Sequence, residues 1–254
     1  MSRTQIVTNV FWNLPDEAKR HFDANADIHL LVCGGGKKRL ESLNDQWMTE
    51  HCIPDDSFED NISHLNPALN EWTSIYMVYK NIGVLPNTPA NIGHCHFRRF
   101  FKREDLEDID TCDGIVAKQM PLGVCGFPCT VKKQYELLHL SRDFDILEGL
   151  LRQTRFWNED SWNEWCNLRF LYAPCNVWLL KRECFNIMMK DILPVILELP
   201  HVIDIDAGRD DYQKRACAFL GERLVSYYFW NSDFRLLKKP LVEMKDWKPA
   251  EASD

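Results

Sequence analysis

Two apolar runs near the start of the chain, residues 5–11 and 28–33, are separated by residues 15–22, which begin with Pro15. Short apolar runs are typical of strands buried on both faces, and Pro is favoured in the first turn of a helix. Strand, helix, strand is the βαβ unit, which places its two strands parallel in one sheet. This unit constrains the fold more strongly than any other feature of the sequence.

The alternation continues along the chain. Asn66 and Pro67 suit the N-cap and first position of a helix, and an apolar stripe predicts that this helix runs to Asn81. We therefore expect an α/β sandwich with a mostly parallel central sheet flanked by helices, and a ligand crevice at the carboxyl ends of the strands. Further strands are predicted at 92–101, 114–118 and 175–180, and further helices at 131–139, 143–153, 161–169, 185–196 with a bend at Pro194, and 216–224.

Composition narrows the function classes. With 254 residues and 45% hydrophobic content, residues 1–247 are expected to form one domain, followed by a polar tail at 248–254. The net charge of −8 argues against extended non-specific contact with nucleic acid or an anionic membrane. No signal-sequence pattern and no apolar stretch of about 18 residues is present, so a cytoplasmic protein is expected. The ten cysteines lack the spacing of a zinc ribbon or a disulfide framework.

A cluster of cationic and titratable side chains follows the predicted strand that starts at residue 92. If the strand continues, His94, His96 and Arg98 share one face, and Arg99 lies on the other with Cys95 and Phe97. Burying such groups costs free energy unless each has a partner. The cluster therefore indicates an anionic ligand or a dense network of ion pairs.

Short motifs precede and follow this cluster. They are Asp60-Asn61-Ile62-Ser63, Asn66, Glu71-Trp72-Thr73-Ser74-Ile75-Tyr76, Lys80-Asn81, Gly93-His94-Cys95-His96-Phe97-Arg98-Arg99, Asn176-Val177-Trp178-Leu179-Leu180, and Arg215 with Glu222-Arg223-Leu224. Together they resemble the signature of a bacterial family long described as a domain of unknown function and often labelled capsular polysaccharide or lipopolysaccharide glycosyltransferase. Phe97 stands where that signature has Tyr, which keeps the ring but loses the hydroxyl.

The resemblance implies a GT-A-like, Rossmann-like fold and transfer of a sugar from a nucleotide-diphosphate donor, with a UDP-sugar favoured. Where GT-A enzymes carry a metal-binding Asp-x-Asp motif, this chain has residues 94–99. Arginines stabilise a leaving diphosphate without a metal, so no metal is expected to be required, although a divalent ion stays possible. On this interpretation His94, Arg98 and Arg99 bind the donor and His96 donates to the diphosphate or the sugar; the alternative is that one arginine only forms an ion pair with Glu71 or Glu222.

Several further residues are candidates for the site, each with a structural alternative. Thr8, Asn9 and Val10 end the first strand and are candidates for contact with the base of the nucleotide. Asp60 and Asn61 are candidates for binding hydroxyls, or simply cap and turn the chain. Asn176 is a candidate for binding sugar hydroxyls, or satisfies a turn.

The remaining candidates are charged residues on predicted helices. Glu71 lies off the apolar face of its helix and can reach the arginines, while His139 and Asp143 are spaced to serve as an acid/base pair for the acceptor, unless Asp143 is an N-cap. Arg215 and Glu222 share a helical face next to Arg223, which suggests support for the donor site; an ordinary solvated face is the alternative. Glu71, His96, Asp143 and Glu222 are the predicted catalytic residues.

Two similarities to known motifs are set aside. The segment Gly34-Gly35-Gly36-Lys37-Lys38 lacks the spacing of a phosphate-binding loop and is expected to be a turn. Asp204-Ile205-Asp206 follows a helix rather than a strand, so a metal site is not expected there.

The sequence thus favours a glycosyltransferase whose hydroxyl acceptor is a bacterial surface glycan. One alternative acceptor is a hydroxymethylated base of bacteriophage DNA, with the basic clusters 37–39, 132–133 and 238–239 beside the cleft. A second alternative is a zinc-dependent hydrolase that uses His94 and His96 with Asp60 or Glu222. A third is a carbohydrate-binding or scaffold module without turnover.

Overall fold

The computed structural model describes residues 3–83, 88–206 and 208–244. Within them a nine-stranded sheet has the order β12-β6-β11-β4-β1-β2-β3, and the short strands β5 and β13 continue from β4. All neighbouring pairs along the main path are parallel except those of β11, which is antiparallel to β4 and β6. The main strands are β1 (Thr4–Val10), β2 (His29–Cys33), β3 (Cys52–Pro54), β4 (Asn91–His96), β6 (Gly114–Ala117), β11 (Trp178–Lys181) and β12 (Leu236–Lys239).

Helices cover both faces of this sheet, as the alternating pattern predicted. Val7 on β1 packs with the buried faces of α5, α9 and α10, whereas Val10 packs with those of α1, α2 and α3. Burying each large apolar side chain contributes roughly 1.5–3 kcal/mol. The helices are α1 (Asp16–Ala24), α2 (Gly36–Ser42), α3 (Gln46–His51), α4 (Asn66–Leu69), α5 (Glu71–Asn81), α6 (Val131–Leu138), α7 (Ser141–Leu151), α8 (Glu159–Cys166), α9 (Arg182–Val202) and α10 (Ala216–Asn231).

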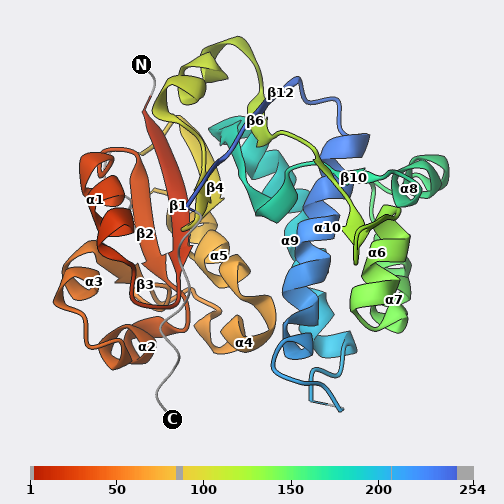
Figure 1. Ribbon diagram of the computed structural model, residues 1–254, viewed down its shortest axis with the longest axis horizontal. Helices are drawn as coiled ribbons and strands as arrows, with labels where there is room; N and C mark the ends of the chain where they lie inside the picture. The colour runs from red at the N-terminus through yellow and green to blue at the C-terminus, as the bar shows by residue number, and fades with distance from the viewer. Residues whose placement is uncertain (1–2, 84–87, 207, 245–254) are drawn as a thin grey trace.

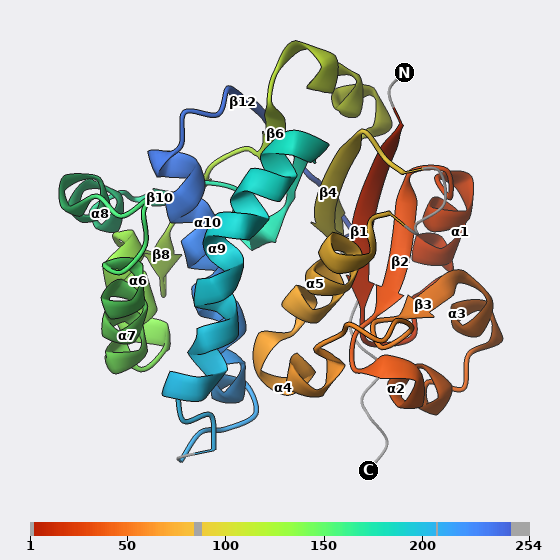
Figure 2. The ribbon, with the colours of Figure 1, turned by 180° about the vertical axis from the view of Figure 1, so that it is seen from behind.

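Helices α6, α7 and α8 pack together as a lobe, and their buried side chains belong to the same hydrophobic core as those of α5, α9 and α10. Figures 1 and 2 show α9 and α10 standing between this lobe and strands β1 to β4. Its core is aromatic, because Phe144, Trp162 and Trp165 pack against one another and against Tyr227 of α10. Short strands connect the lobe to the sheet: β7 (Met120–Pro121), β8 (Gly123–Val124), β9 (Phe127–Pro128) and β10 (Phe170–Leu171).

The structure departs from the predicted elements in several places. The helix predicted from residue 66 to 81 is broken at Asn70, whose φ of 52° is incompatible with a continuous helix, and Asn66 is the first residue of α4 rather than an N-cap. Helix α9 continues through Pro194 and Pro200 to Val202. The predicted polar tail, residues 248–254, lies outside the described residues.

The chain returns to the sheet after α10, which the sequence did not indicate. Strand β12 pairs with β6, and β13 (Val242–Glu243) pairs with β5 (Arg99–Phe100). Four segments of 3₁₀ helix, η1 (Ser63–Leu65), η2 (Arg103–Thr111), η3 (Pro174–Asn176) and η4 (Gln213–Arg215), complete the described elements. None of the helices in the described part of the chain has the length and apolar character needed to cross a membrane.

Candidate active site

A cavity of about 150 Å³ lies where β1 and β4 end, between the sheet and the start of α10. We call it the central cavity. Aromatic side chains, Phe11, Trp12 and Phe219, form part of its wall. The residues predicted from sequence that line it are Asn9, Glu71, His94, His96, Arg99, Arg215 and Glu222.

A larger groove of about 980 Å³ adjoins the central cavity, and we call it the outer groove. The two share Phe11, Trp12, Asn70 and Arg215, so they form one cleft. The lining of the groove includes the turn after β2, where Gly35 has a φ of 86°, and the cationic side chains of Lys38, Arg39 and Lys214. Of the segment predicted as a turn, Gly34 and Gly35 form the turn beside the cleft, whereas residues 36–38 are the first residues of α2.

The chain reverses direction immediately after His96, and this decides which arginine enters the cavity. Strand β4 ends at His96, Phe97 and Arg98 form a turn, and Arg99 on β5 pairs back against His96. The predicted grouping of His94, His96 and Arg98 on one face is therefore wrong. Arg99 lines the central cavity with the two histidines, whereas Arg98 is not among the lining residues and its guanidinium lies 5.5 Å from the Phe97 ring.

The side chain of Arg99 is held on both sides. Its Nε and Nη2 donate to Glu243 Oε1 at 3.0 and 2.7 Å, and its Nη1 donates to Cys175 Sγ at 3.2 Å. Burial, with the nearby Glu222 carboxylate, raises the pKa of Cys175 to about 11, so the thiol is neutral. Glu243 lies on β13, so the C-terminal strand positions Arg99.

The two histidines carry their protons on opposite nitrogens. His94 Nδ1 lies 2.6 Å from the carbonyl oxygen of Asn176, which can only accept, so this nitrogen carries the proton and Nε2 is an acceptor. His96 Nδ1 accepts from the backbone N–H of Arg98 at 3.3 Å, so its proton is on Nε2. Burial lowers the pKa of His94 to about 4, and burial with the Arg98 charge lowers that of His96 to about 3. Both rings are therefore neutral at pH 7.

The segment that accepts from His94 has an unusual backbone. Ala173, Cys175 and Asn176 have φ values of 44°, 61° and 55°, which non-glycine residues rarely adopt. Glu222 Oε1 accepts from Cys175 N at 2.7 Å, and the Asn176 side-chain oxygen accepts from Trp178 Nε1 at 2.8 Å. Glu222 thus holds this segment, and neither Arg98 nor Arg99 forms an ion pair with Glu222 or Glu71 among the described residues.

Glu71 begins α5 and is half-buried in the cavity. Its Oε1 lies 3.5 Å from the Asn176 amide nitrogen. Burial, with the neighbouring Glu222 carboxylate, raises the pKa of Glu71 to about 7, although Arg215 and Asn176 act in the opposite direction. A carboxyl group with a pKa near neutrality can exchange a proton at physiological pH, as a general acid or base must.

Arg215 lies at the junction of the central cavity and the outer groove. Its guanidinium lies 5.4 Å from the Phe219 ring and forms no ion pair with the described part of the chain. Arg215, Lys38 and Arg39 line the cleft without an ion pair to the described residues, whereas Arg99 is paired with Glu243 and Lys214 with Asp211.

Of the three residues predicted at the end of β1, only Asn9 lines the cavity. Thr8 is fully buried on the opposite face, where its hydroxyl contacts His29 Nδ1 at 2.9 Å and Cys95 Sγ at 3.1 Å. Val10 is in the apolar core with α1. Because side chains alternate along a strand, one strand cannot present three consecutive residues to one site.

Asp60 and Asn61 do not line the cleft. Asp60 accepts from the Tyr76 hydroxyl at 2.6 Å and lies 3.5 Å from Lys80 Nζ, and Asn61 donates to the Phe58 carbonyl at 2.7 Å. These contacts favour the structural alternative, in which the two residues fix the loop ahead of α4.

The acid/base pair predicted at His139 and Asp143 is not supported. Asp143 accepts from both terminal nitrogens of Arg209, at 2.7 and 2.8 Å, and both side chains are 1% exposed. Asp143 also is not an N-cap, because Leu140 holds that position of α7. Because its side chain is only 1% exposed, the Asp143 carboxylate is not accessible to a substrate in this structure.

The prediction that Arg223 binds the donor is also wrong, because its side chain points away from the cleft. Its Nη2 donates to the Gln134 side chain at 2.9 Å, its Nη1 donates to the Phe219 carbonyl, and its guanidinium lies 5.0 Å from the Tyr135 ring. Arg223 joins α10 to α6 in the lobe.

Asp55 is a positioning residue that sequence reasoning missed. It is fully buried directly after β3, where it accepts from the Ser63 and Thr73 hydroxyls and from Gly35 N. It therefore fixes the glycine turn of the outer groove to α5. Asp55 directly follows a strand, at the carboxyl edge of the sheet where ligands bind, and this position could have indicated its role from the sequence.

No group of three or more His, Cys, Asp or Glu side chains within the described ranges is arranged to hold a metal ion. Asp204 and Asp206 do not line the cleft, and Asp204 Oδ1 accepts from Asp206 N at 3.0 Å.

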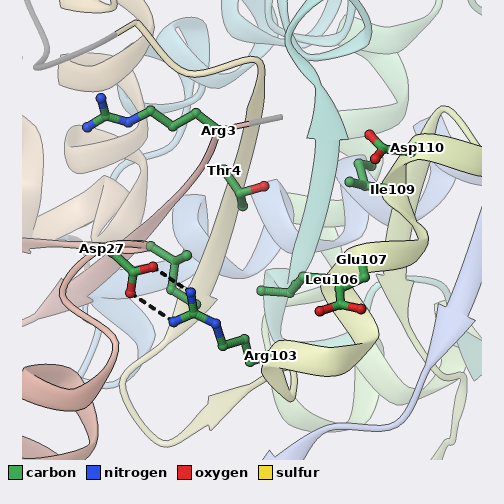
Figure 3. Close-up of a pocket in the computed structure, with 9 residues that line it drawn as sticks. Arg3, Thr4, Asp27, Arg103, Leu106, Glu107, Ile109 and Asp110 are labelled. Carbon is green, nitrogen blue, oxygen red and sulfur yellow. Dashed lines mark hydrogen bonds and ion pairs between the residues drawn. The ribbon is translucent and has the colours of Figure 1, made fainter. Parts of the chain in front are cut away.

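A separate cavity of about 400 Å³ lies at the amino ends of β1 and β2 and contains none of the predicted residues. Figure 3 shows Asp27 and Arg103 next to each other in its lining, and Arg103 donates to both carboxylate oxygens at 2.9 and 2.6 Å. This ion pair satisfies the guanidinium, so Arg103 provides a control for the arginines of the cleft.

Comparison with known proteins places this cleft in a family. A family described as "Domain of unknown function (DUF4422)" matches residues 36–233. The chain belongs to this family. The matched range includes the cleft residues from α2 to Glu222 but not Asn9. No match was found among curated protein sequences.

Among solved structures, the fold is similar to the apo structure of the WbbM bifunctional glycosyltransferase, with a TM-score of 0.72 and 16% identity. The alignment covers 98% of this chain and 48% of that chain, so this chain spans about half of its length. Mouse xyloside xylosyltransferase 1 in its apo form aligns with 88% of this chain and 83% of its own, at 14% identity and a TM-score of 0.32. The first likeness confirms the predicted GT-A-like fold.

Proposed function

We propose that this chain is a glycosyltransferase that moves a sugar from a nucleotide-diphosphate sugar to a hydroxyl acceptor. One observation carries the proposal: His94, His96, Arg99 and Arg215 meet Glu71 in one cleft at the carboxyl ends of the strands of a GT-A-like fold. Ligands of open α/β sheets bind at this edge.

The cleft offers distinct places for the parts of such a donor. The outer groove, at about 980 Å³, is near the upper end of the roughly 300–1,000 Å³ typical of small-molecule sites and suits the nucleotide. Arg215 at the junction, with Lys38 and Lys214 in the groove, suits the diphosphate. Charge-assisted hydrogen bonds from arginine stabilise the charge that develops on a leaving diphosphate, and His96 Nε2–H is a further donor.

Glu71 is the residue we assign to proton transfer. Its raised pKa of about 7 lets it be ionised in part of the population at neutral pH and accept the proton of an acceptor hydroxyl. Glu222 is a positioning residue. It accepts a hydrogen bond from Cys175 N, and its carboxylate raises the pKa of Glu71. The rate of transfer should therefore rise with pH toward a plateau above about pH 7.

A surface glycan remains the favoured acceptor. Of the three basic clusters that DNA binding would use, only residues 37–39 lie beside the cleft. Lys132 and Lys133 line a different cavity together with Glu136 and Glu148, and Lys239 pairs with Asp105 and Asp108. This distribution offers no continuous basic track for a DNA backbone.

The test is a transfer assay with a panel of UDP-, GDP- and dTDP-sugars, in which release of the nucleoside diphosphate is measured with and without glycan and hydroxymethylated DNA acceptors. We expect one donor to be turned over, and we expect turnover to survive an excess of chelator. Arg215→Ala should raise KM for that donor at least about tenfold.

Arg103→Ala is the matched control, because it removes an arginine that is paired with Asp27 at the other edge of the sheet. An equal rise in KM in both variants would indicate a general effect of the protein's charge and not a contact between Arg215 and the donor. Absence of binding and turnover with every donor in the panel would refute the proposed function and favour a scaffold module.

A further inference from the structure

Two buried polar atoms of residues that line the central cavity have no hydrogen-bond partner among the described residues. They are His94 Nε2 and Asn9 Nδ2, and their side chains belong to residues that are only 2% and 3% exposed. Leaving a buried polar atom without a partner costs free energy, because the atom has lost its hydrogen bonds to water. A fold that retains two such atoms in one cavity is poised to bind a ligand that satisfies both.

Their chemistry is complementary and is fixed by the groups behind them. Because His94 Nδ1–H donates to the Asn176 carbonyl, Nε2 has a lone pair that is available to accept a hydrogen bond. The Asn9 side-chain oxygen accepts from the Ser74 hydroxyl at 2.9 Å, which leaves the Nδ2 group of Asn9 as a donor. Two residues that line the cavity therefore carry one unpaired acceptor and one unpaired donor.

The two side chains also lie on the same face of neighbouring strands. In the parallel register of β1 and β4, Val7 pairs with His94 and Asn9 pairs with His96. Residues two apart on a strand share a face, so Asn9 and His94 are diagonal neighbours on the cavity side of the sheet. One small group can therefore reach both of them.

The size of the cavity limits what that group belongs to. About 150 Å³ corresponds to roughly five water molecules at ~30 Å³ each, which is well below the ~300 Å³ at which sites for drug-sized ligands begin. The cavity is thus sized for one monosaccharide ring and not for a nucleotide, which the adjoining outer groove can hold.

We propose that the central cavity binds the sugar of the donor, and that one hydroxyl of this sugar donates to His94 Nε2 while it accepts from Asn9 Nδ2. A hydroxyl is the smallest group that can donate and accept at once. This assignment rests on the proposed function, and it makes His94 and Asn9 determinants of which sugar is accepted. A site built to hydrogen-bond a hydroxyl rejects the analogue that lacks it, because its own polar atoms are then left unpaired.

The first test needs no variant. The best nucleotide sugar of the panel is compared with its monodeoxy derivatives, and with the free nucleoside diphosphate, by calorimetric binding and by kcat/KM. We expect one monodeoxy derivative to lose at least about 100-fold in kcat/KM, while the free nucleoside diphosphate binds as before. If every monodeoxy derivative is used equally well, the sugar subsite is refuted although the transferase function stands.

The second test separates the two nitrogens of His94. His94→Asn keeps a donor near the position of Nδ1 but removes Nε2, whereas His94→Gln offers an acceptor near the position of Nε2. We expect His94→Asn to lower kcat/KM for the parent sugar at least about tenfold and to leave that of the sensitive monodeoxy derivative unchanged, with partial recovery in His94→Gln. Asn9→Ala should cause the same selective loss.

His51→Asn is the matched control, because His51 is on the outside of α3 beside Asp23. If His94→Asn and Asn9→Ala lower kcat/KM equally for the parent and deoxy sugars, the two residues are structural and the proposal is wrong. If no nucleotide sugar in the panel binds or reacts, the proposed function fails, and this inference fails with it.

Discussion

Arg98 and Arg99 are adjacent in the chain but have different environments, because the turn after His96 places only Arg99 in the central cavity. We predict that Arg99→Ala lowers kcat/KM for the donor at least about tenfold, since it removes a charge-assisted contact beside the diphosphate site. Arg98→Ala keeps the backbone N–H that fixes His96, so it should change kcat/KM less than about threefold. Steady-state kinetics of both variants decide this, and an equal loss would contradict the assignment.

The same turn explains why alternation along the sequence misplaced this pair. The pattern His94, His96 predicts their shared face correctly, because both residues lie on β4. Beyond His96 the period-two rule no longer applies, since the chain is no longer a single strand. Nothing in Phe97-Arg98 alone marks a reversal, because neither residue is a typical turn former.

Glu71 provides a pH-dependent prediction about stability. Its pKa of about 7 in the folded protein is above the ordinary 4.5, so folding favours the protonated form. The wild-type protein should therefore lose stability as the pH rises from about 4.5 to 7, and Glu71→Gln should not. We expect Glu71→Gln to raise the free energy of unfolding on the order of 1–2 kcal/mol at pH 8, because the half-buried carboxylate is partly screened by solvent.

Urea unfolding at pH 4 and pH 8 measures this difference. The variant should gain at pH 8 and be nearly neutral at pH 4, while turnover falls at both. If Glu71→Gln is less stable than the wild type at pH 8, the ionised carboxylate stabilises the fold, and this prediction is wrong.

At the scale of elements, close contact between α5 and α10 forms one wall of the cleft. A Cβ atom added to Gly221 would lie 2.1 Å from Trp72 Nε1, which is too close for any side chain. Only glycine allows α10 to approach α5 so closely, and this approach brings Glu222 and Arg215 to the same cavity as Glu71.

We therefore predict that Gly221→Ala lowers the free energy of unfolding by about 1–3 kcal/mol, although alanine is the better helix former. Gly149→Ala on α7 is the matched control, because a Cβ there meets no atom within 4 Å. The control should gain roughly 0.5–1 kcal/mol from helix propensity. Thermal unfolding of both variants checks the opposite signs.

The break between α4 and α5 also belongs to this scale. Asn70 lines both parts of the cleft with a φ of 52°, and the Asn66 amide donates to the Asn70 carbonyl and the Thr73 hydroxyl at the break. The apolar stripe indicated one helix, because periodicity reports which face is buried and is insensitive to one residue of irregular backbone. The amide network that stabilises the break exists only in the folded chain.

For the whole molecule, the buried pair of Asp143 and Arg209 ties the lobe of α6, α7 and α8 to the segment that follows α9. We predict that Asp143→Asn lowers the free energy of unfolding by about 3–5 kcal/mol, because it leaves a buried guanidinium without its counter-charge. KM for the donor should not change, since neither residue lines the cleft. Asp145→Asn, two residues away and exposed beside Lys132, should change stability by less than about 1 kcal/mol.

Chemical denaturation combined with donor kinetics separates this structural role from the catalytic one suggested by the sequence. If Asp143→Asn stays folded and loses turnover without losing stability, the carboxylate takes part in the reaction after all.

Local patterns in the sequence are enough to establish the class of fold. The pattern of apolar residues within each segment shows which of its own side chains are buried. This holds for the βαβ unit, the strands from residues 92 and 114 and the amphipathic helices, and a mostly parallel sheet flanked by helices follows from them. The approximate site also follows, since polar residues after successive parallel strands must meet at one edge of the sheet. His94, His96 and Asn9 were predicted to lie at this edge, and all three line the central cavity.

The tertiary structure alone determined which of these polar side chains face one another. Glu222, Arg215 and Cys175 lie more than seventy residues from the β4 histidines in the chain, and Glu243 comes from a strand that the sequence did not indicate. Their partners are set by the distance between α5 and α10, the positive φ of the η3 segment and the return of the C-terminal strand. A local pattern reports whether a residue is buried, whereas its partner across the fold depends on packing between distant elements, and therefore only the folded chain shows it.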